Sequence, residues 1–375
     1  MSTIATRALF AILFAASAFG CAAETTDTDA TETEDELRAK DAASLTTSDV
    51  SVLFPAPTGP SAGYLTASTV GRGGAFLPES VVDALPSRLD FSTAGLTSGR
   101  LYYAGTNLVG LRLDPCSGRL GTDVVPGCLA EVRLVFQPSG TGGMDDGAVH
   151  AFYRLTRPEL LSLLDTIVRA RKASGGPAPS SLGVHPVAAR EGMQGAFARV
   201  VTAKVKELAG AQNLVKVTFF GRGAGRPKKW TFGQFDIDRG LPTAATIPTV
   251  GSTTQLLDGS TVTPASSHAD NFMKLPAFDD SRRDAALRVE NPRFHTPSTM
   301  GCVECHETPS ELVLLPPGNR FQFTSPVSTA VVGTGGDAEN LHFFSYMGRT
   351  ASVSQRTGNE SAQVVERFRT ILRGR

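Results

Sequence analysis

The sequence predicts an α+β fold with a mostly antiparallel, β-rich body and two or three helices. Residues 108–113, 132–136 and 149–155 alternate apolar and polar side chains, as half-buried strands do. Two segments with helical periodicity follow, and then two more strand-like segments at 214–220 and 230–237. Strands that come in runs, with the helices between the runs, are typical of an α+β fold.

The helices have recognisable beginnings and ends. Thr156, Arg157, Pro158 and Glu159 form a capping-box pattern with proline in the first turn, so we expect a helix that ends near Lys172. A second helix is expected over 190–209, with Gly210 as its stop signal, and a third over 361–373.

The chain divides into four regions by composition. We expect a signal peptide over 1–20, a tether over 21–50, the α+β body over 51–240, and a loop-rich region that carries a C-x-x-C-H motif over 241–375. Residues 240–300 are rich in Thr, Pro, Ser and Asp and show little periodicity, so we expect long loops there. One or two short strands are expected within 321–332.

Charge and composition exclude one class of function. The chain has 36 Lys and Arg against 36 Asp and Glu, and its formal net charge is zero. Binding to phosphate backbones needs an excess of cations, so no nucleic-acid partner is expected. Hydrophobic residues make up 41% of the chain and charged residues 19%, which is typical of a globular protein.

The N-terminus has the pattern of an exported protein. Arg7 precedes an apolar run over residues 8–20, which is too short to cross a bilayer and fits a secretory signal. The segment Ala18-Phe19-Gly20-Cys21 resembles the lipobox of bacterial lipoproteins. That resemblance implies that Cys21 is lipidated and becomes the first residue of the mature chain. The alternative is a plain signal peptide cut at a site of the Ala-x-Ala type.

The region after Cys21 suits a membrane-anchored protein. Residues 24–50 are rich in Thr, Asp and Glu and carry almost no bulky apolar side chain, so we expect an acidic, disordered tether over 21–50. A lipid anchor would make the membrane a partner and place the protein in the cell envelope. Ala22 after the lipidated cysteine favours the outer membrane by the lipoprotein sorting rule, with a periplasmic or surface-exposed body.

Cys116 and Cys128 flank a segment rich in turn-forming residues, between two of the expected strands. Exported proteins fold under oxidising conditions, so we predict a disulfide between these two cysteines that closes a hairpin-like connection. The alternative is a pair of buried free thiols.

The most specific pattern is Cys302-Val303-Glu304-Cys305-His306. It resembles the C-x-x-C-H attachment site of c-type cytochromes. The resemblance covers this short motif and implies a covalently bound haem c, with thioether bonds from Cys302 and Cys305 and with His306 as the proximal iron ligand.

Three other interpretations of the motif stay open. Cys302 and Cys305 could form a small-loop disulfide. The two cysteines and His306 could hold zinc with a distant fourth ligand such as His295 or His342. A thioredoxin-like dithiol would need the motif at a junction between a strand and a helix, whereas its flanks look loop-like.

A haem in an electron carrier usually has a second axial ligand. Met347 is our first choice because it follows the motif within an aromatic segment. His342 lies in the same segment, while His295 and His268 precede the motif. Met300 lies two residues before Cys302 and is discounted because it is too near the motif to reach across the iron.

Together these patterns predict an exported, lipid-anchored monohaem c-type protein that transfers electrons to a redox partner protein or senses redox state. The alternative is a non-catalytic binding or structural lipoprotein of the envelope, in which Cys302 and Cys305 form a disulfide. The sequence contains no motif typical of a hydrolase, so it does not indicate an enzyme.

Overall fold

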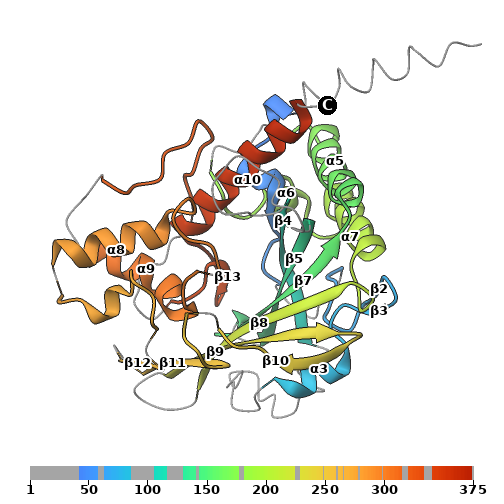
Figure 1. Cartoon of the computed structure of the whole chain (residues 1–375). Coiled ribbons are helices and arrows are strands. Elements are labelled where there is room, and N and C mark those ends of the chain that lie inside the picture. The colour runs from blue at the N-terminus through green and yellow to red at the C-terminus, as the bar shows by residue number, and fades with distance from the viewer. Residues whose placement is uncertain are drawn as a thin grey trace, which may run out of the picture.

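The computed structural model describes residues 42–57, 63–85, 105–115, 130–140, 143–176, 181–223, 229–247, 249–258, 261–264, 266–277, 279–297, 299–314, 320–332 and 340–373. Within them lies one ten-stranded antiparallel sheet with helices on both sides (Figure 1), which confirms the expected α+β class. None of the described helices is both long and apolar enough to cross a membrane.

The order of strands across the large sheet is β1-β4-β5-β7-β8-β9-β11-β12, with β6 beside β5 and β10 beside β9. Its strands are β1 (Ser51–Leu53), β4 (Thr106–Asp114), β5 (Ala130–Gly140), β6 (Gly143–Met144), β7 (Ala148–Leu155), β8 (Leu214–Gly223), β9 (Lys229–Asp238), β10 (Leu241–Ala244), β11 (Thr254–Asp258) and β12 (Thr261–Thr263). Two small hairpins pair β2 (Val70–Gly71) with β3 (Gly74–Ala75), and β13 (Phe344–Met347) with β14 (Thr350–Val353).

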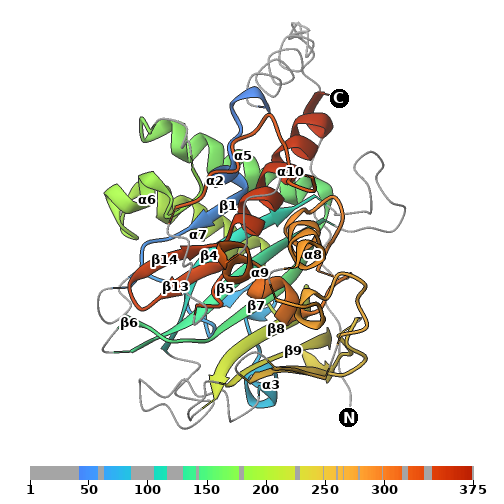
Figure 2. The same cartoon turned by 90° about the vertical axis from the view of Figure 1, so that its left-hand side faces the viewer.

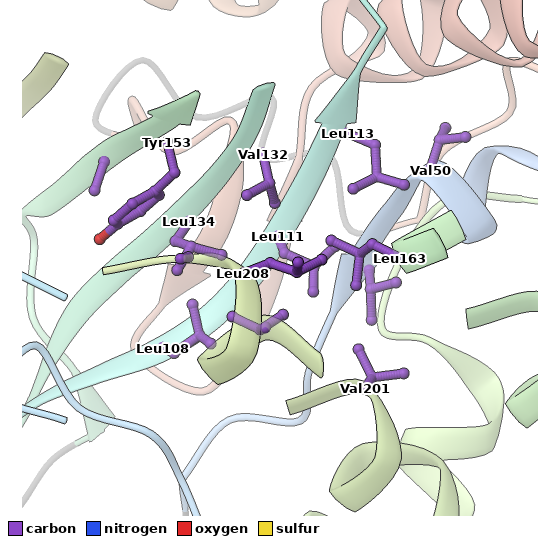
Figure 3. Packing of buried hydrophobic residues seen from close by; sticks show 14 of the residues in the cluster. Val50, Leu108, Leu111, Leu113, Val132, Leu134, Tyr153, Leu163, Val201 and Leu208 are labelled. Atoms are coloured by element: carbon purple, nitrogen blue, oxygen red, sulfur yellow. The ribbon is translucent and has the colours of Figure 1, made fainter. Parts of the chain in front are cut away.

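One face of the large sheet is apolar. Alternate residues such as Leu111, Val132 and Leu134 point to this face and are fully buried. They pack in one cluster with residues of α5 (Arg157–Ala173) and α7 (Ala196–Leu208), as Figure 3 shows for Leu163 and Leu208. Period-two alternation in the strands and helical periodicity in α5 and α7 therefore meet in one hydrophobic core.

The opposite face is covered by helices from the C-terminal part of the chain. These are α8 (Asp280–Glu290), α9 (Cys302–Leu314) and α10 (Gln355–Arg373), and we call them, with the β13–β14 hairpin, the roof. Figure 2 shows α8, α9 and the hairpin in front of the central strands. Figure 1 places this layer and the pair α5 and α7 on opposite sides of the sheet.

The expected helices are present with revised bounds, and the described residues contain more helices than the two or three expected. α5 has the predicted capping box between Thr156 and Glu159. The segment expected as one helix over 190–209 is two helices, α6 (Pro186–Glu191) and α7, because Gly192 lies between them at φ 69°, outside the helical region. A short helix α3 (Glu79–Ala84) was not expected, and α10 begins before residue 361.

The region 240–300 is more regular than expected. It contains β10, β11, β12, the 3-10 helix η2 (Phe272–Lys274) and α8. The large sheet therefore continues across the boundary expected near residue 240. Residues 321–332, by contrast, contain no strand but an isolated bridge from Leu182 to Val331. The short strands escaped prediction because β11 and β12 extend an edge whose stability comes from pairing with β9, not from their own sequence.

The expected tether ends earlier than residue 50. Residues 47–50 form α2 (Thr47–Val50) and are buried. The Asp49 carboxylate accepts bonds of 2.6 and 3.1 Å from the Arg171 guanidinium of α5, and both side chains are at most 4% exposed. Arg369 of α10 donates to the carbonyl of Ala42. Residues from 42 onwards thus belong to the folded body.

Candidate functional site

The C-x-x-C-H motif lies in the first turns of α9, not in a loop as its flanks suggested. Residues at i, i+3 and i+4 share one face of a helix, so Cys302, Cys305 and His306 project to the same side. All three line a cavity of about 480 Å³ between the roof and the sheet.

A side chain from the sheet caps the start of α9. Gln255 of β11 accepts a 3.0 Å bond from the Val303 backbone N–H and donates a 3.2 Å bond to Glu304 Oε2. Gly301 stands just before the helix, where a Cβ atom would lie 2.1 Å from Glu304 Oε2. These contacts satisfy an orphan N–H at the helix start and fix the motif against the sheet.

The floor of the cavity is the polar face of the central strands. Antiparallel pairing aligns Arg112, Arg133, Phe152, Lys216 and Asp236 in one row across five strands. The neighbouring rows add Asp114, Glu131 and Arg154 on one side and His150, Thr218 and Gln234 on the other.

One of these charges, Arg112, is paired with the roof. Glu360 of α10 accepts bonds of 2.8 Å from Arg112 and 2.8 Å from Arg356. Burial would raise the pKa of Glu360, but Arg356 and Arg112 outweigh burial and lower it to about 2. Arg133 lies over the Phe152 ring, 4.4 Å from its centroid. The carboxylate of Glu360 is therefore ionised, and it ties α10 to the sheet.

His306 is held in one orientation. Its Nδ1 lies 2.6 Å from the carbonyl oxygen of Leu341, so Nδ1 carries the proton and donates it. The imidazole stacks on Phe343 at 4.3 Å and touches Phe220 and Phe232. Burial lowers its pKa to about 4, so the ring is neutral at neutral pH.

This arrangement leaves Nε2 of His306 as the free lone pair of the ring. Among the described residues Nε2 has no hydrogen-bond partner. A histidine that ligates a metal commonly donates its other ring N–H to a backbone carbonyl or a carboxylate, which fixes the tautomer. His306 has this arrangement.

The two thiols of the motif are not bonded to each other. Burial raises the pKa of both Cys302 and Cys305 to about 12. A thioredoxin-like dithiol needs a lowered thiol pKa, because the thiolate is the nucleophile. The surroundings of these cysteines shift the pKa in the opposite direction, and the segment before α9 is not a strand.

The residues named for a zinc site do not gather around the motif. His295 Nε2 lies 2.8 Å from Asp270 and its Nδ1 lies 3.1 Å from His268 Nε2, so His295 and His268 are engaged with each other. Among the described residues, no group of three or more His, Cys, Asp or Glu side chains is placed to hold a metal ion.

The structure does not bring the first-choice distal ligands into the cavity. Met347 lies at the end of β13, 37% exposed, and is not among the lining residues. His342 is buried and is not among the lining residues either, and its Nδ1 lies 2.8 Å from Ser345 Oγ. Met300, which we had discounted, does line the cavity, but it packs in a cluster with Phe272 of η2.

The sequence interpretation missed His150 of β7, which lines the cavity. Burial, followed by the charge of Arg133, lowers the pKa of His150 well below its usual value. One signal was present, because His150, Phe152 and Arg154 alternate with the apolar residues of this strand. Alternation marks them as facing away from the core, but it does not show what they face.

The other cysteines, Cys21, Cys116 and Cys128, lie outside the described residues. The strands on either side of Cys116 and Cys128 are antiparallel neighbours, and Asp114 pairs directly with Glu131. The disulfide between Cys116 and Cys128 stays a prediction, in a connection between two strands whose ends are adjacent.

The geometry is compatible with a haem. The cavity volume lies within the range of about 300–1,000 Å³ that is usual for small-molecule and cofactor sites. The motif faces the cavity, and Nε2 of His306 is free to ligate iron. Three cationic side chains of the floor, Arg133, Arg154 and Lys216, line the cavity together with the acidic side chains of Asp114, Glu131 and Asp236. No protein-family model, curated protein or solved structure matches the chain.

Proposed function

We propose that the protein is an exported, lipid-anchored monohaem c-type protein that transfers single electrons or senses redox state in the cell envelope. The observation that carries this proposal is the orientation of the motif. Cys302, Cys305 and His306 share one face of α9, this face lines the cavity, and His306 has its Nδ1 proton committed to Leu341.

Each residue of the site has a distinct part in holding the cofactor. The Cys302 and Cys305 thiols would add across the vinyl groups of the haem to form thioether bonds, and His306 would ligate the iron through Nε2. Arg133, Arg154 and Lys216 would neutralise the propionates. When bound, the haem supplies a one-electron couple between ferric and ferrous iron. Phe220, Phe232 and Phe343 exclude water from the His306 side, and burial of this kind is one of the factors that set a haem potential.

The anchor belongs to the proposal as well. Lipidation at Cys21 would leave about twenty acidic and polar residues between the membrane and the body that begins at Ala42. A redox partner protein would then meet the body at the membrane surface. The outer membrane is the favoured location, because Ala22 follows the lipidated cysteine.

The test is a pyridine haemochrome spectrum of the mature protein, produced together with a c-type haem maturation system. We expect a covalent c-type spectrum in the parent and its loss in the double variant Cys302→Ser, Cys305→Ser. The matched control is the double variant Cys116→Ser, Cys128→Ser, which removes two cysteines far from the motif in the sequence and should keep the haem.

The spectrum of the parent can also contradict the proposal. A parent that is folded and exported but carries no covalent haem would contradict the proposal. That outcome would favour the alternative of a non-catalytic envelope lipoprotein, and mass spectrometry of the unreduced chain would then test the disulfide between Cys302 and Cys305.

A further inference from the structure

The chain contains six histidines, all of them in described segments, and they differ in what their ring nitrogens contact. His268 and His295 form a closed network with Asp270. The His268 Nδ1 accepts from the Asp270 N–H at 2.9 Å, and its Nε2 lies 3.1 Å from His295 Nδ1. The His295 Nε2 lies 2.8 Å from the Asp270 carboxylate. All four ring nitrogens in this network are therefore engaged.

Two more histidines are buried away from the cavity. His185 stacks on Phe197 at 4.1 Å beside the apolar core, with neither nitrogen hydrogen-bonded. His342 is 3% exposed, and its Nε2 is buried without a partner. Neither residue lines the cavity. The Nδ1 of His342 is also engaged, 2.8 Å from Ser345 Oγ.

His150 and His306 remain, and both line the cavity. They come from opposite layers, since His150 is on β7 of the floor and His306 is on α9 of the roof. Both imidazoles contact the ring of Phe220, with ring centroids 6.4 Å away for His150 and 5.0 Å for His306. The same ring also contacts His342, with centroids 5.2 Å apart, but of these three imidazoles only His150 and His306 line the cavity.

The surroundings of His150 leave its nitrogens available. In the described part of the chain, neither ring nitrogen of His150 has a hydrogen-bond partner. Its cross-strand neighbours are Val135 on β5 and Thr218 on β8, and neither competes for the imidazole. The backbone of a central strand, paired on both sides, holds the side chain toward the cavity.

We infer that His150 is the second axial ligand of the haem iron, opposite His306. This inference rests on the proposed function and deepens it. With imidazoles on both sides, the iron has no open coordination position, so the site is specialised for electron transfer rather than for binding a small molecule at the metal. Met347 and His342 then have other roles, in the β13–β14 hairpin and in the packing behind Phe220.

The test compares the spin state of the ferric iron in the haem-loaded parent and in His150→Ala. We expect a low-spin, six-coordinate optical and electron paramagnetic resonance spectrum in the parent. The variant should keep the same covalent haem content, lose the low-spin signal and regain it when imidazole is added. His150→Met should restore six-coordination with a thioether and raise the reduction potential.

Three control variants make the assignment specific. Thr218→Val changes the residue paired with His150 across the strands, which also lines the cavity, and should leave the spectrum unchanged. Met347→Leu and His342→Leu remove the other sequence candidates and should also leave it unchanged. A His150→Ala variant that stays low-spin, or a parent that is high-spin, would overturn the inference.

Failure of the inference can be told apart from failure of the proposed function. Pyridine haemochrome content reports attachment through the two cysteines, whatever the distal ligand is. A parent without haem overturns both statements. A parent with haem whose ligation does not depend on His150 overturns the inference alone.

Discussion

The two faces of the large sheet are built from the same strands but differ in what they contact. One face forms the apolar core, and the other lines the cavity. On β5, Leu134 points into the apolar core and is fully buried, while its neighbour Arg133 points into the cavity. On β7, Tyr153 and Phe152 divide in the same way. One face meets α5 and α7 through apolar contacts, and the other meets the roof through a smaller apolar cluster beside ion pairs and hydrogen bonds.

This difference separates stability from chemistry. Burial of apolar surface is the dominant favourable term in folding, and it is concentrated on the face of the sheet that α5 and α7 cover. The charged face contributes less to stability, because the gain of a charge pair is offset by the loss of hydration. Substitutions on the two faces should therefore differ in what they change, and this expectation can be tested.

The largest expected effect is at the buried ion pair between Asp49 of α2 and Arg171 of α5. Asp49→Asn leaves the Arg171 guanidinium, which is 4% exposed, without its counter-charge. We expect a loss of about 3–5 kcal/mol in the free energy of unfolding, measured by urea denaturation. Asp165→Asn, which breaks the exposed pair with Arg169 on the same helix, should cost less than about 0.5 kcal/mol. Equal losses of unfolding free energy in the two variants would contradict our conclusion that the face of the sheet covered by α5 and α7 is shielded from water.

The next largest effect is seen by comparing substitutions at two adjacent residues of β5. Leu134→Ala opens a cavity in the core and should cost about 2–5 kcal/mol of unfolding free energy. Arg133→Gln removes a weak 3.4 Å pair with Glu131 and a contact with Phe152, and should cost about 1 kcal/mol. Differential scanning calorimetry of both variants decides the order. A larger loss for Arg133→Gln would reverse our assignment of the two faces.

A smaller effect depends on pH. Burial, followed by the charge of Arg171, lowers the pKa of His185 to about 3. The unfolded chain then takes up a proton below about pH 6.5 that the folded chain does not, so this group reduces stability as pH falls from about 6.5 to about 3, by up to about 1.4 kcal/mol per unit.

His185→Leu removes that proton uptake. The difference in unfolding free energy between variant and parent should grow in favour of the variant as pH falls through this window. Glu360 should act in a lower window, because its stabilising charge is lost between about pH 4.5 and 2. Parallel pH curves for parent and His185→Leu would show that His185 is not the buried neutral group described.

The smallest effect concerns the start of α5. Thr156→Ala removes the capping box with Glu159 and should cost about 1 kcal/mol. Thr166→Ala, within the same helix, loses only a bond to the carbonyl of Ser162 and should change stability little. Thermal unfolding of the two variants distinguishes the stability contributed by the cap from that contributed by helix propensity. Similar losses in both would argue against the cap.

Local patterns in the sequence predicted much of the fold. The central strands, the start of α5 and the stop after α7 follow from alternation, a capping box and a glycine, which are all contiguous signals. α9 was missed because Pro309 and the proline-rich flanks argue against a helix. Its start is capped by Gln255, which lies 48 residues away in the sequence. A cap of that kind has no local signal.

The site divides in the same way. The motif on α9 is contiguous, so the sequence revealed it. The residues of the cavity floor are not contiguous in the sequence, because they come from five strands whose register is set by pairing. His150 in the sequence looks like any polar residue of a strand, and only the pairing with β8 and the seating of α9 give it a place near His306.

The motif-bearing helix also forms one wall of the cavity that its side chains line. Its cap, Gln255, belongs to β11, a strand near the edge of the large sheet that pairs with β9. The orientation of the motif therefore depends on a strand that is far away in the sequence. A substitution that weakens the pairing of β11 would disturb the motif without changing any of its residues.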